Sequence, residues 1–494
     1  MRWLIFVYLA LAKASSSMTY DELIDRAEAL AGQPFTPKEA ALPQWMLDLD
    51  YKAYRTINFK REKMVWGGES QFAIEFFHPG YLFRTPVTVT LGGEEKRFDP
   101  EDFRYEAGRS EVTEGEKELH LSGLRVLSKF GGEEWREVLI LQGASYWRAT
   151  GSENLLGLSA RGAALETGEL KSEEFPSFTE IHVEEPEPDS QTLTLSLLME
   201  SESLTGAFKL KLTPGKETLV QVESTLFARK DLRRVGIAAM SSMFWYSPAF
   251  PWEFRDWGRP SVHDSDGLVV HTKDGERLWK PLTNQRRTIE FSVLDGTDSR
   301  GFGLLQRKQN QESFGDPVAL YEKRTSLYIE PMEPWGNGQI VLVELPTDSE
   351  YVDNIALMWE PQGGIKAGER RAFRYTQRWT SATNPADAPG QIRCVSLKRN
   401  EKGASLVLGC TPFNPTFLQQ IENLYMEVSG VSGDVSRTFS VPITQRSETG
   451  ELSASIQLEH LAAEDSFKPT EWRCSLKRPD HTAITETWLY TLHR

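Results

Sequence analysis

The stretch LTLSLLMESESLTGAFKLKLTPGKETLVQV, residues 193–222, decides the class of fold. Leucine alternates with hydroxyl residues at 193–197, and apolar residues alternate with lysine at 208–212. A Pro-Gly-Lys turn at 214–216 then leads into LVQV at 219–222. Successive side chains of a strand point to opposite faces, so these runs predict strands with one buried and one solvated face. The turn predicts an antiparallel hairpin.

The same alternation, broken by Gly, Pro and Asp turns, continues along most of the chain. We find no alternation of strands with helices, and only the spacing of Leu23, Ala27 and Leu30 predicts a helix, from about Thr19 to Ala31. The pattern therefore predicts an all-β protein with a large antiparallel β-sandwich domain followed by a small immunoglobulin-like β-sandwich domain.

A Pro-, Ala- and Asp-rich segment, TSATNPADAPG at 380–390, lacks periodicity and indicates a linker. We expect a large domain at 18–380, a linker at 381–391 and the small domain at 392–494. The acidic stretch EEPEPD at 184–189 resembles a linker too, but strand patterns resume directly after it, so we expect a surface loop.

The composition of the 494 residues is that of a soluble globular protein, with 39% hydrophobic and 26% charged residues. Asp and Glu number 71 against 56 Lys and Arg, a net charge of −15, which argues against binding to nucleic acid. Arg2, the apolar run 3–12 and Ala12-Lys13-Ala14 form a signal-peptide pattern, so we expect residues 1–17 to direct export of a secreted or periplasmic protein. A buried N-terminal helix is the alternative. We expect no membrane span.

Metal and cofactor motifs are missing from the sequence. The three cysteines, Cys394, Cys410 and Cys474, form no CxxC pair, and the histidines form no HExxH or HxH pattern. One cysteine pair could oxidise outside the cytoplasm. There is also no phosphate-binding loop, dinucleotide fingerprint or GxSxG elbow. We therefore expect neither a metal ion nor a cofactor.

Aromatic and acidic residues together indicate what the protein binds. The sequence has 14 Trp, 14 Tyr and 25 Phe, and β-sandwiches that bind sugars stack pyranose rings on aromatic side chains. The alternative is that most of these rings fill the core, because aromatic residues suit a pleated surface.

Ten blocks carry a resemblance to a known family. In order along the chain they are GASYWR (143–148), GLSARG (157–162), EEFPSF (173–178), SMF (242–244), HDSDGL (263–268), KPLTN (280–284), GFGLLQR (301–307), WGNG (335–338), VELPT (343–347) and VDNIALMWEP (352–361). With them the chain resembles the periplasmic glucan biosynthesis protein family, OpgG/OpgD or MdoG, from about Tyr20 to Trp379. The resemblance implies a long cleft in the large domain and action on β-1,2-linked glucan in the periplasm.

The resemblance also implies catalytic residues, because members of this family include inverting β-1,2-glucanases that need no metal. The general acid of those enzymes corresponds to Asp353, and the general base corresponds to Asp264. Inversion needs one protonated and one ionised carboxyl group. Asp348 and Glu350 are expected to help raise the pKa of Asp353 if they fold close to it. The family reaches its base through a relay of water and hydroxyl groups.

Sugar-binding candidates are taken from the same blocks. They are Tyr146, Arg161, Phe244, His263, Asp266, Trp335 and Trp359. Because strands alternate faces, about half of such residues should point into the core. The chain departs from the family where Arg324-Thr325-Ser326 replaces the common Arg-Pro-Ser, and where Lys280 replaces a common arginine.

Two functional hypotheses remain open at this point. One is an inverting endo-β-1,2-glucanase, and the other is a non-catalytic carrier or scaffold that binds nascent glucan. A purely structural envelope protein is a third, blander option. Other glucan-synthesis proteins of the envelope and a second copy of the chain are the further partners that we expect.

Overall fold

The computed structural model describes residues 18–491 except 69, 106–118, 170–171, 251–257, 285–287, 383–389, 401–402, 413–423, 433–434, 444, 447–451 and 458–470. The predicted signal peptide lies outside these residues, and so does most of the predicted linker. Within them the protein is dominated by β-strands, and the predicted all-β class is confirmed. No helix in these ranges is long and apolar enough to cross a membrane.

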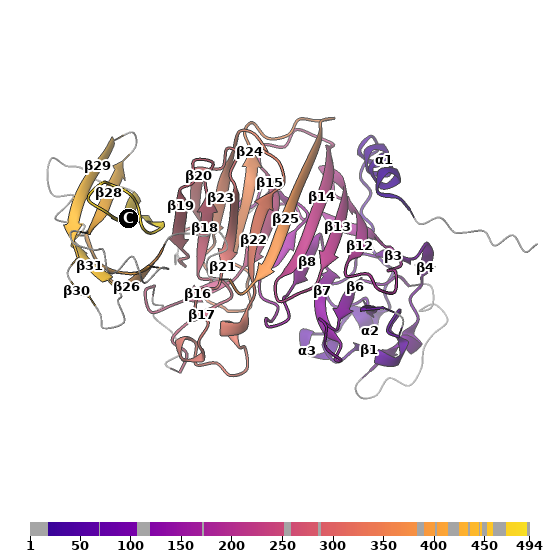
Figure 1. The fold of residues 1–494 in the computed structure, drawn as a ribbon. Coiled ribbons are helices and arrows are strands. Elements are labelled where there is room, and N and C mark those ends of the chain that lie inside the picture. Colours follow the sequence, from indigo (N-terminus) through magenta and orange to yellow (C-terminus); the bar gives the residue numbers. More distant parts are fainter. Residues whose placement is uncertain are drawn as a thin grey trace, which may run out of the picture.

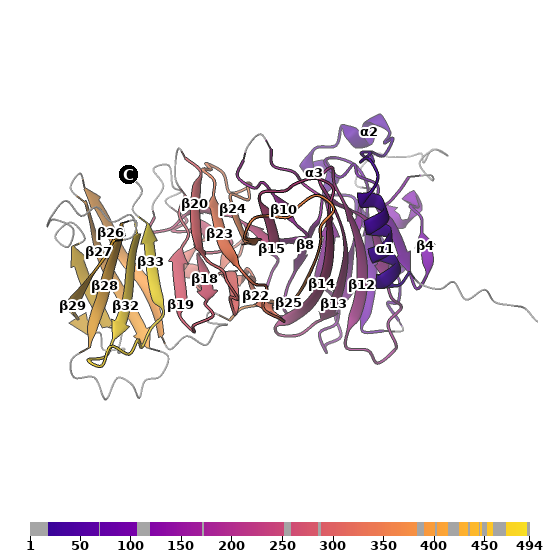
Figure 2. The same cartoon turned by 90° about the horizontal axis from the view of Figure 1, so that it is seen from above.

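Two large sheets stack face to face, as Figures 1 and 2 show from two directions. The first sheet runs in the order β2 (Phe72–Phe77), β6 (Gly123–Ser128), β7 (Arg136–Gln142), β8 (Tyr146–Ala149), β9 (Ser159–Arg161), β15 (Val235–Ser242), β24 (Ile355–Pro361), β23 (Gly338–Glu344) and β20 (Glu290–Asp295), with β10 (Ala164–Leu165) paired to β15. The second runs in the order β19 (Arg277–Pro281), β18 (Gly267–His271), β21 (Gly301–Leu305), β22 (Ser326–Pro331), β25 (Arg370–Thr380), β14 (Thr218–Ala228), β13 (Leu204–Thr213), β12 (Leu193–Glu200), β11 (Ser177–Val183), β3 (Thr88–Leu91) and β4 (Glu94–Lys96).

The stretch that predicted the fold forms the middle of the second sheet. Leu195 of β12 pairs with Leu210 of β13, and Leu210 pairs with Val222 of β14. These side chains are buried in the core between the sheets, whereas Lys211 is exposed on the other face. The predicted hairpin is therefore confirmed. The acidic segment 184–189 is the predicted surface loop, between β11 and β12.

Helix α1 (Tyr20–Ala31) is the predicted helix, and it begins at a capping box formed by Thr19 and Glu22. Its buried residues, Leu23, Ile24 and Ala27, pack on the outer face of the second sheet. The other helical elements are short: α2 (Gln44–Leu47), α3 (Tyr51–Tyr54) and 3₁₀ turns at Arg61–Lys63, Pro100–Asp102, Gln311–Ser313 and Tyr321–Lys323. Two small ladders complete the large sandwich: β1 (Asn58–Phe59) with β5 (Phe103–Arg104), and β16 (Phe244–Tyr246) with β17 (Val262–His263).

The C-terminal strands form a smaller sandwich, which we call the C-terminal sandwich (residues 390–491). One of its sheets contains β33 (Thr487–Thr491), β32 (Glu471–Lys477), β28 (Tyr425–Ser432) and β29 (Val435–Pro442), and the other contains β26 (Gly390–Asn400), β27 (Gly403–Pro412), β31 (Leu452–Gln457) and β30 (Gln445–Arg446). Its strand β33 pairs in parallel with β19, so one sheet continues from the large sandwich into the small one. Cys394, Cys410 and Cys474 form no disulfide bond with one another.

Candidate functional site

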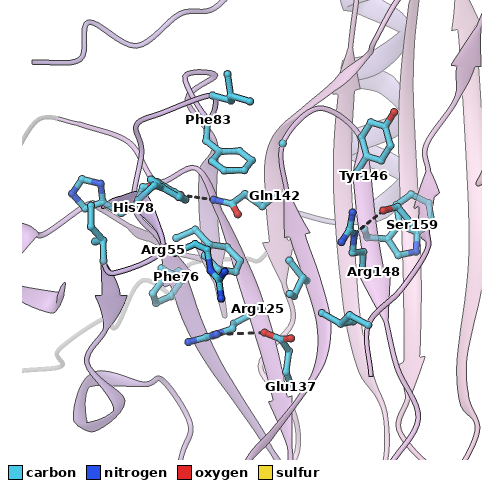
Figure 3. A pocket seen from close by; sticks show the side chains of 18 of the residues that line it. Arg55, Phe76, His78, Phe83, Arg125, Glu137, Gln142, Tyr146, Arg148 and Ser159 are labelled. Atoms are coloured by element: carbon cyan, nitrogen blue, oxygen red, sulfur yellow. Dashed lines mark hydrogen bonds and ion pairs between the residues drawn. The ribbon is translucent and has the colours of Figure 1, made fainter. Parts of the chain in front are cut away.

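A cleft of about 850 Å³ opens where α3 and the turn after β2 meet the first sheet. Its walls carry Tyr54, Arg55, Phe76, His78, Phe83, Arg125, Glu137, Gln142, Tyr146, Arg148 and Asp353, among others. Figure 3 shows Tyr146, Arg148 and Ser159 together on one side of the cleft, with the pair Arg125–Glu137 on the other. Aromatic walls with a few placed charges are typical of a site for a polar ring-shaped ligand.

Asp353 lies at one end of this cleft, in the loop that joins β23 to β24. Its carboxylate Oδ2 is 3.7 Å from Nη2 of Arg148, and its side chain is 40% exposed. Arg148 in turn donates a hydrogen bond from Nε to the hydroxyl of Ser159, at 2.7 Å. The sequence block GASYWR therefore provides the arginine that faces the expected general acid.

The neighbouring Asn354 explains why this loop has a defined shape. Its fully buried amide accepts a hydrogen bond from the Phe244 N–H (2.8 Å) and donates to the carbonyl oxygens of Phe244 and Leu345 (both 3.0 Å). These three bonds tie the ends of the Asp353 loop to β16. The second residue of the Asp-Asn pair is thus a structural clamp beside the first.

Asp264 follows β17, and its side chain is 15% exposed, with Oδ1 3.4 Å from Nε of Arg324. Burial raises the pKa of Asp264 to about 6. The positive charges of Arg324 and Arg148 act against this rise, and the negative charges of Asp353 and Glu350 add to it. The two expected catalytic carboxylates therefore belong to one electrostatic site, although 89 positions separate them in the sequence.

The carboxylate of Glu350 bonds to Tyr321 and Arg259, not to the expected general acid Asp353. Its Oε2 accepts hydrogen bonds from the Tyr321 hydroxyl (2.6 Å) and from Nη1 of Arg259 (2.8 Å). Its negative charge raises the pKa of Asp264. We had expected this glutamate to act on Asp353, but the fold directs its carboxylate to Tyr321, on the side of the base.

A buried ion pair supports the start of the Asp353 loop. Glu344, the last residue of β23, lies 3.2 Å from Nζ of Lys280, and its other oxygen accepts hydrogen bonds from the N–H and hydroxyl of Thr283. Asn284 then bonds to the main chain of Thr347 in that loop. The KPLTN block is therefore structural, and Lys280 lies in the protein interior.

Two of the seven sugar-binding candidates lie at the site. Tyr146 lines the cleft beside Asp353, and burial raises the pKa of its hydroxyl. The guanidinium of Arg161 lies 5.2 Å from the centroid of the Tyr146 ring and 3.7 Å from Glu173, with only 3% of the side chain exposed. The buried guanidinium of Arg161 therefore packs against the ring of Tyr146.

Phe244, His263 and Asp266, three further sugar-binding candidates, have protein partners and do not line this cleft. Phe244 and His263 are paired across β16 and β17, stack at 5.2 Å, and are both fully buried. Asp266 accepts a hydrogen bond from the N–H of Arg307 and is influenced by Lys308. The burial pattern alternates along this segment: His263 and Ser265 are buried, while Asp264 and Asp266 are partly exposed.

Trp335 and Trp359, the last two sugar-binding candidates, do not line this cleft. Trp359 is buried, and its Nε1 donates to the carbonyl of Gly296 at 2.9 Å. It lies five residues along β24 from Asn354, which corresponds to roughly 17 Å. Trp335 packs edge-on against Trp359 at 5.3 Å. Both rings belong to an aromatic cluster at the end of the strands opposite the Asp353 loop.

Three side chains of the site were missed in the sequence: Arg148, Arg324 and Tyr321. Arg148 and Arg324 stand in segments that the sequence had marked, but nothing in their spacing says that they face carboxylates. Tyr321 comes from a 3₁₀ turn without a recognisable pattern. Among the described residues, no group of three His, Cys, Asp or Glu side chains could hold a metal ion.

Comparisons with known proteins identify the family of this chain. The family model "Periplasmic glucan biosynthesis protein, MdoG" matches residues 18–492. Glucans biosynthesis protein G 2 of Shewanella oneidensis is 33% identical, and the match covers 97% of this chain and 89% of that protein. Glucans biosynthesis protein D 2 of Ralstonia nicotianae is 34% identical over 97% of this chain and 91% of that protein. A galactose mutarotase related enzyme of Lactobacillus acidophilus matches in structure with a TM-score of only 0.22. Over nearly its whole length, the chain belongs to the MdoG family of periplasmic glucan biosynthesis proteins.

Proposed function

We propose that this protein is an inverting endo-β-1,2-glucanase that shapes periplasmic glucan, with Asp353 as general acid and Asp264 as general base. Its family has a role in periplasmic glucan biosynthesis. The observation that carries the proposal is that two carboxylates from separate loops each lie beside an arginine: Asp353, which lines the cleft, beside Arg148, and the mostly buried Asp264 beside Arg324. The negative charge of Asp353 also contributes to the raised pKa of Asp264, which is caused mainly by burial.

The proposed step moves two protons. Asp353 gives its proton to the oxygen of the scissile glycosidic bond as the bond to the anomeric carbon breaks. A water molecule attacks that carbon from the opposite face and loses its proton to Asp264. The base must be ionised, and a carboxyl group with a pKa of about 6 is mostly ionised at pH 7 while remaining a stronger base than an exposed aspartate.

Tyr321 is a candidate for the hydroxyl relay that the family resemblance implies. Because Asp264 is mostly buried, a proton from the attacking water has to reach its carboxylate through another hydroxyl group or water molecule. The Tyr321 hydroxyl donates a hydrogen bond to Glu350, and the pKa of that hydroxyl is raised by burial, by Glu350 and, to a smaller extent, by the negative charge of Asp264. We infer that this hydroxyl passes a proton between water and Asp264. Tyr321→Phe would remove this route while keeping the ring.

The direct test is to incubate the purified protein with linear β-1,2-glucan. We expect new reducing ends, and the anomer formed first should have the configuration opposite to that of the cleaved bond. Reducing-end chemistry and NMR spectra recorded within the first minutes measure both. Saturable glucan binding without cleavage would instead support the carrier hypothesis, with both aspartates as ligands for sugar hydroxyls.

A matched pair of variants tests where the sugar binds. Tyr146→Ala should weaken binding of β-1,2-glucan about tenfold, because it removes an aromatic wall of the cleft. Trp359→Phe should leave binding unchanged and lower the free energy of unfolding by about 0.5–1.5 kcal/mol, because the buried carbonyl of Gly296 loses one of its two donors and keeps the N–H of Ser299. Calorimetric titration and denaturant unfolding measure the two effects. Equal losses of glucan affinity in both variants would contradict this assignment.

Partnership with other glucan-synthesis proteins and formation of a homodimer stay predictions. Export to the periplasm agrees with the family, whose name includes that compartment.

A further inference from the structure

The segment Leu305–Lys308, directly after β21, holds the stretch that contains Asp264. The carbonyl of Leu305 accepts a hydrogen bond from the N–H of Asp266 (2.8 Å), and the N–H of Arg307 donates to Oδ1 of Asp266 (3.2 Å). The fully buried side chain of Gln306 donates to the carbonyl of His263 (2.9 Å). Residues on both sides of the expected base are therefore fixed by one short segment.

Arg307 also reaches the C-terminal sandwich. Its Nη1 and Nη2 donate to Oε1 and Oε2 of Glu486 at 2.7 and 2.8 Å, and the exposed fractions of the two side chains are 9% and 1%. Glu486 Oε1 also accepts a hydrogen bond from the N–H of Ile392 (3.0 Å). A two-point contact of this kind fixes both the position and the orientation of the guanidinium.

The surroundings of this ion pair are rigid. The guanidinium of Arg307 lies 3.5 Å from the ring centroid of Trp279, which pairs with Trp488 across the parallel strands β19 and β33. Leu305 and Trp279 belong to the same apolar cluster as the core of the C-terminal sandwich. A displacement of Glu486 would therefore be passed to the segment 305–308.

We propose that Glu486 of the C-terminal sandwich is a positioning residue for the general base Asp264, and that it acts through Arg307 and Asp266. The proposal rests on the proposed function only in naming Asp264 as the base. It gives the GFGLLQR block a role, since this block contains Arg307. It also gives the small sandwich a part in the reaction, although its described residues contribute no lining to the cleft.

The test uses the full mature chain with Glu486→Gln, which keeps the size of the side chain and removes its charge. We expect the pKa of Asp264 to fall from about 6 towards the value of about 4 that exposed aspartates have, because loosening of the segment admits water. Titration of ¹³C-labelled aspartate carboxyl groups by NMR, with the Asp264 signal assigned through Asp264→Asn, measures this directly. Turnover should fall at least about tenfold, with KM little changed.

Glu360→Gln is the matched control. Glu360 is also buried and accepts hydrogen bonds from Nε and Nη2 of Arg234, at 3.1 and 2.8 Å. It lies near the end of β24 that is remote from Asp353. This variant should leave the titration of Asp264 and the turnover unchanged even if it lowers the stability of the protein.

A double-variant cycle separates positioning from a simple change of charge. If Glu486 acts through Asp266, then Glu486→Gln combined with Asp266→Asn should shift the pKa of Asp264 little more than the larger single change. Additive shifts, no shift in Glu486→Gln, or an equal shift in Glu360→Gln would each overturn the inference. Should Glu486→Gln fail to fold, Arg307→Met with Glu486→Leu replaces the pair by apolar side chains, and the same shift is expected.

The titration does not depend on cleavage. A wild-type protein that fails to cleave glucan would refute the proposed function, while the shift in Glu486→Gln would still show that the C-terminal sandwich positions Asp264. Cleavage by the wild type without any such shift would leave the function standing and refute the inference.

Discussion

Replacing Asp353 by asparagine is expected to lower kcat for β-1,2-glucan hydrolysis on the order of 10³-fold. The amide cannot give a proton to the leaving oxygen, and proton transfer by a placed side chain contributes about 10² to 10⁴ to such reactions. The side chain is 40% exposed and its contact with Arg148 is long at 3.7 Å, so the fold should not depend on its charge. Turnover with reducing-end detection, together with the melting temperature, measures both.

Asp348→Asn is the control for this variant, because Asp348 is an exposed aspartate of the same loop. It should keep the turnover of the wild type. A glucan with a good leaving group, which needs less help from an acid, should be cleaved by Asp353→Asn with a much smaller loss. Full turnover of the natural glucan by Asp353→Asn would exclude Asp353 as the acid.

Replacing Asp264 by asparagine is expected to abolish cleavage and to stabilise the protein at pH 7. The pKa of Asp264 is raised to about 6 in the folded protein, compared with an ordinary value of 3.8. The folded chain therefore holds this proton more tightly than the unfolded chain. The stability from this group is fully present below about pH 4 and is lost as the pH rises through 6.

The size of the expected stabilisation follows from the two pKa values of Asp264, about 6 in the folded protein and 3.8 ordinarily. The gap between them corresponds to roughly 3 kcal/mol, and it already includes the favourable attraction of Arg324. Asparagine remains neutral, so its variant should be more stable than the wild type at pH 7 by up to this amount. The two proteins should differ less at pH 4. Unfolding by denaturant at both pH values tests this, and a variant that is less stable at pH 7 would contradict it.

The pH dependence of wild-type turnover gives an independent check of the base. Below about pH 6, kcat/KM should fall about tenfold for each pH unit, because Asp264 becomes protonated. A rate that stays constant down to pH 4 would mean that another group accepts the proton.

Much of the architecture could be predicted because it depends on local periodicity. The alternation at 193–222 places Leu195, Leu210 and Val222 in the core whichever strands lie opposite, since only one face of each strand can be apolar. The helix at Tyr20–Ala31 likewise follows from its spacing and its capping box. The continuity of the sheet from β19 into β33 could not be predicted, because no local pattern specifies a parallel pair of strands more than 200 positions apart.

The candidate site also has a part that the sequence predicted and a part that it did not. The resemblance led to Asp353 and Asp264, and the coupling between them supports that choice without testing it. Aromatic residues in the same blocks do not identify a sugar site by themselves, because a tryptophan that fills the core and one that binds a sugar look alike in a sequence. Trp359 and Phe244 are buried because β24 and β16 direct them inwards.

By itself the sequence determined the strand pattern, the all-β class, the first helix and the family, because each of these depends on short-range periodicity or on ordered blocks of residues. Only the tertiary structure decided which charges meet. Arg148 faces Asp353, Arg324 faces Asp264, and Glu486 holds Arg307, in each case across a separation that no motif spans. The physical reason is that electrostatic coupling and burial depend on distance in space, which the packing of two sheets and a second sandwich sets.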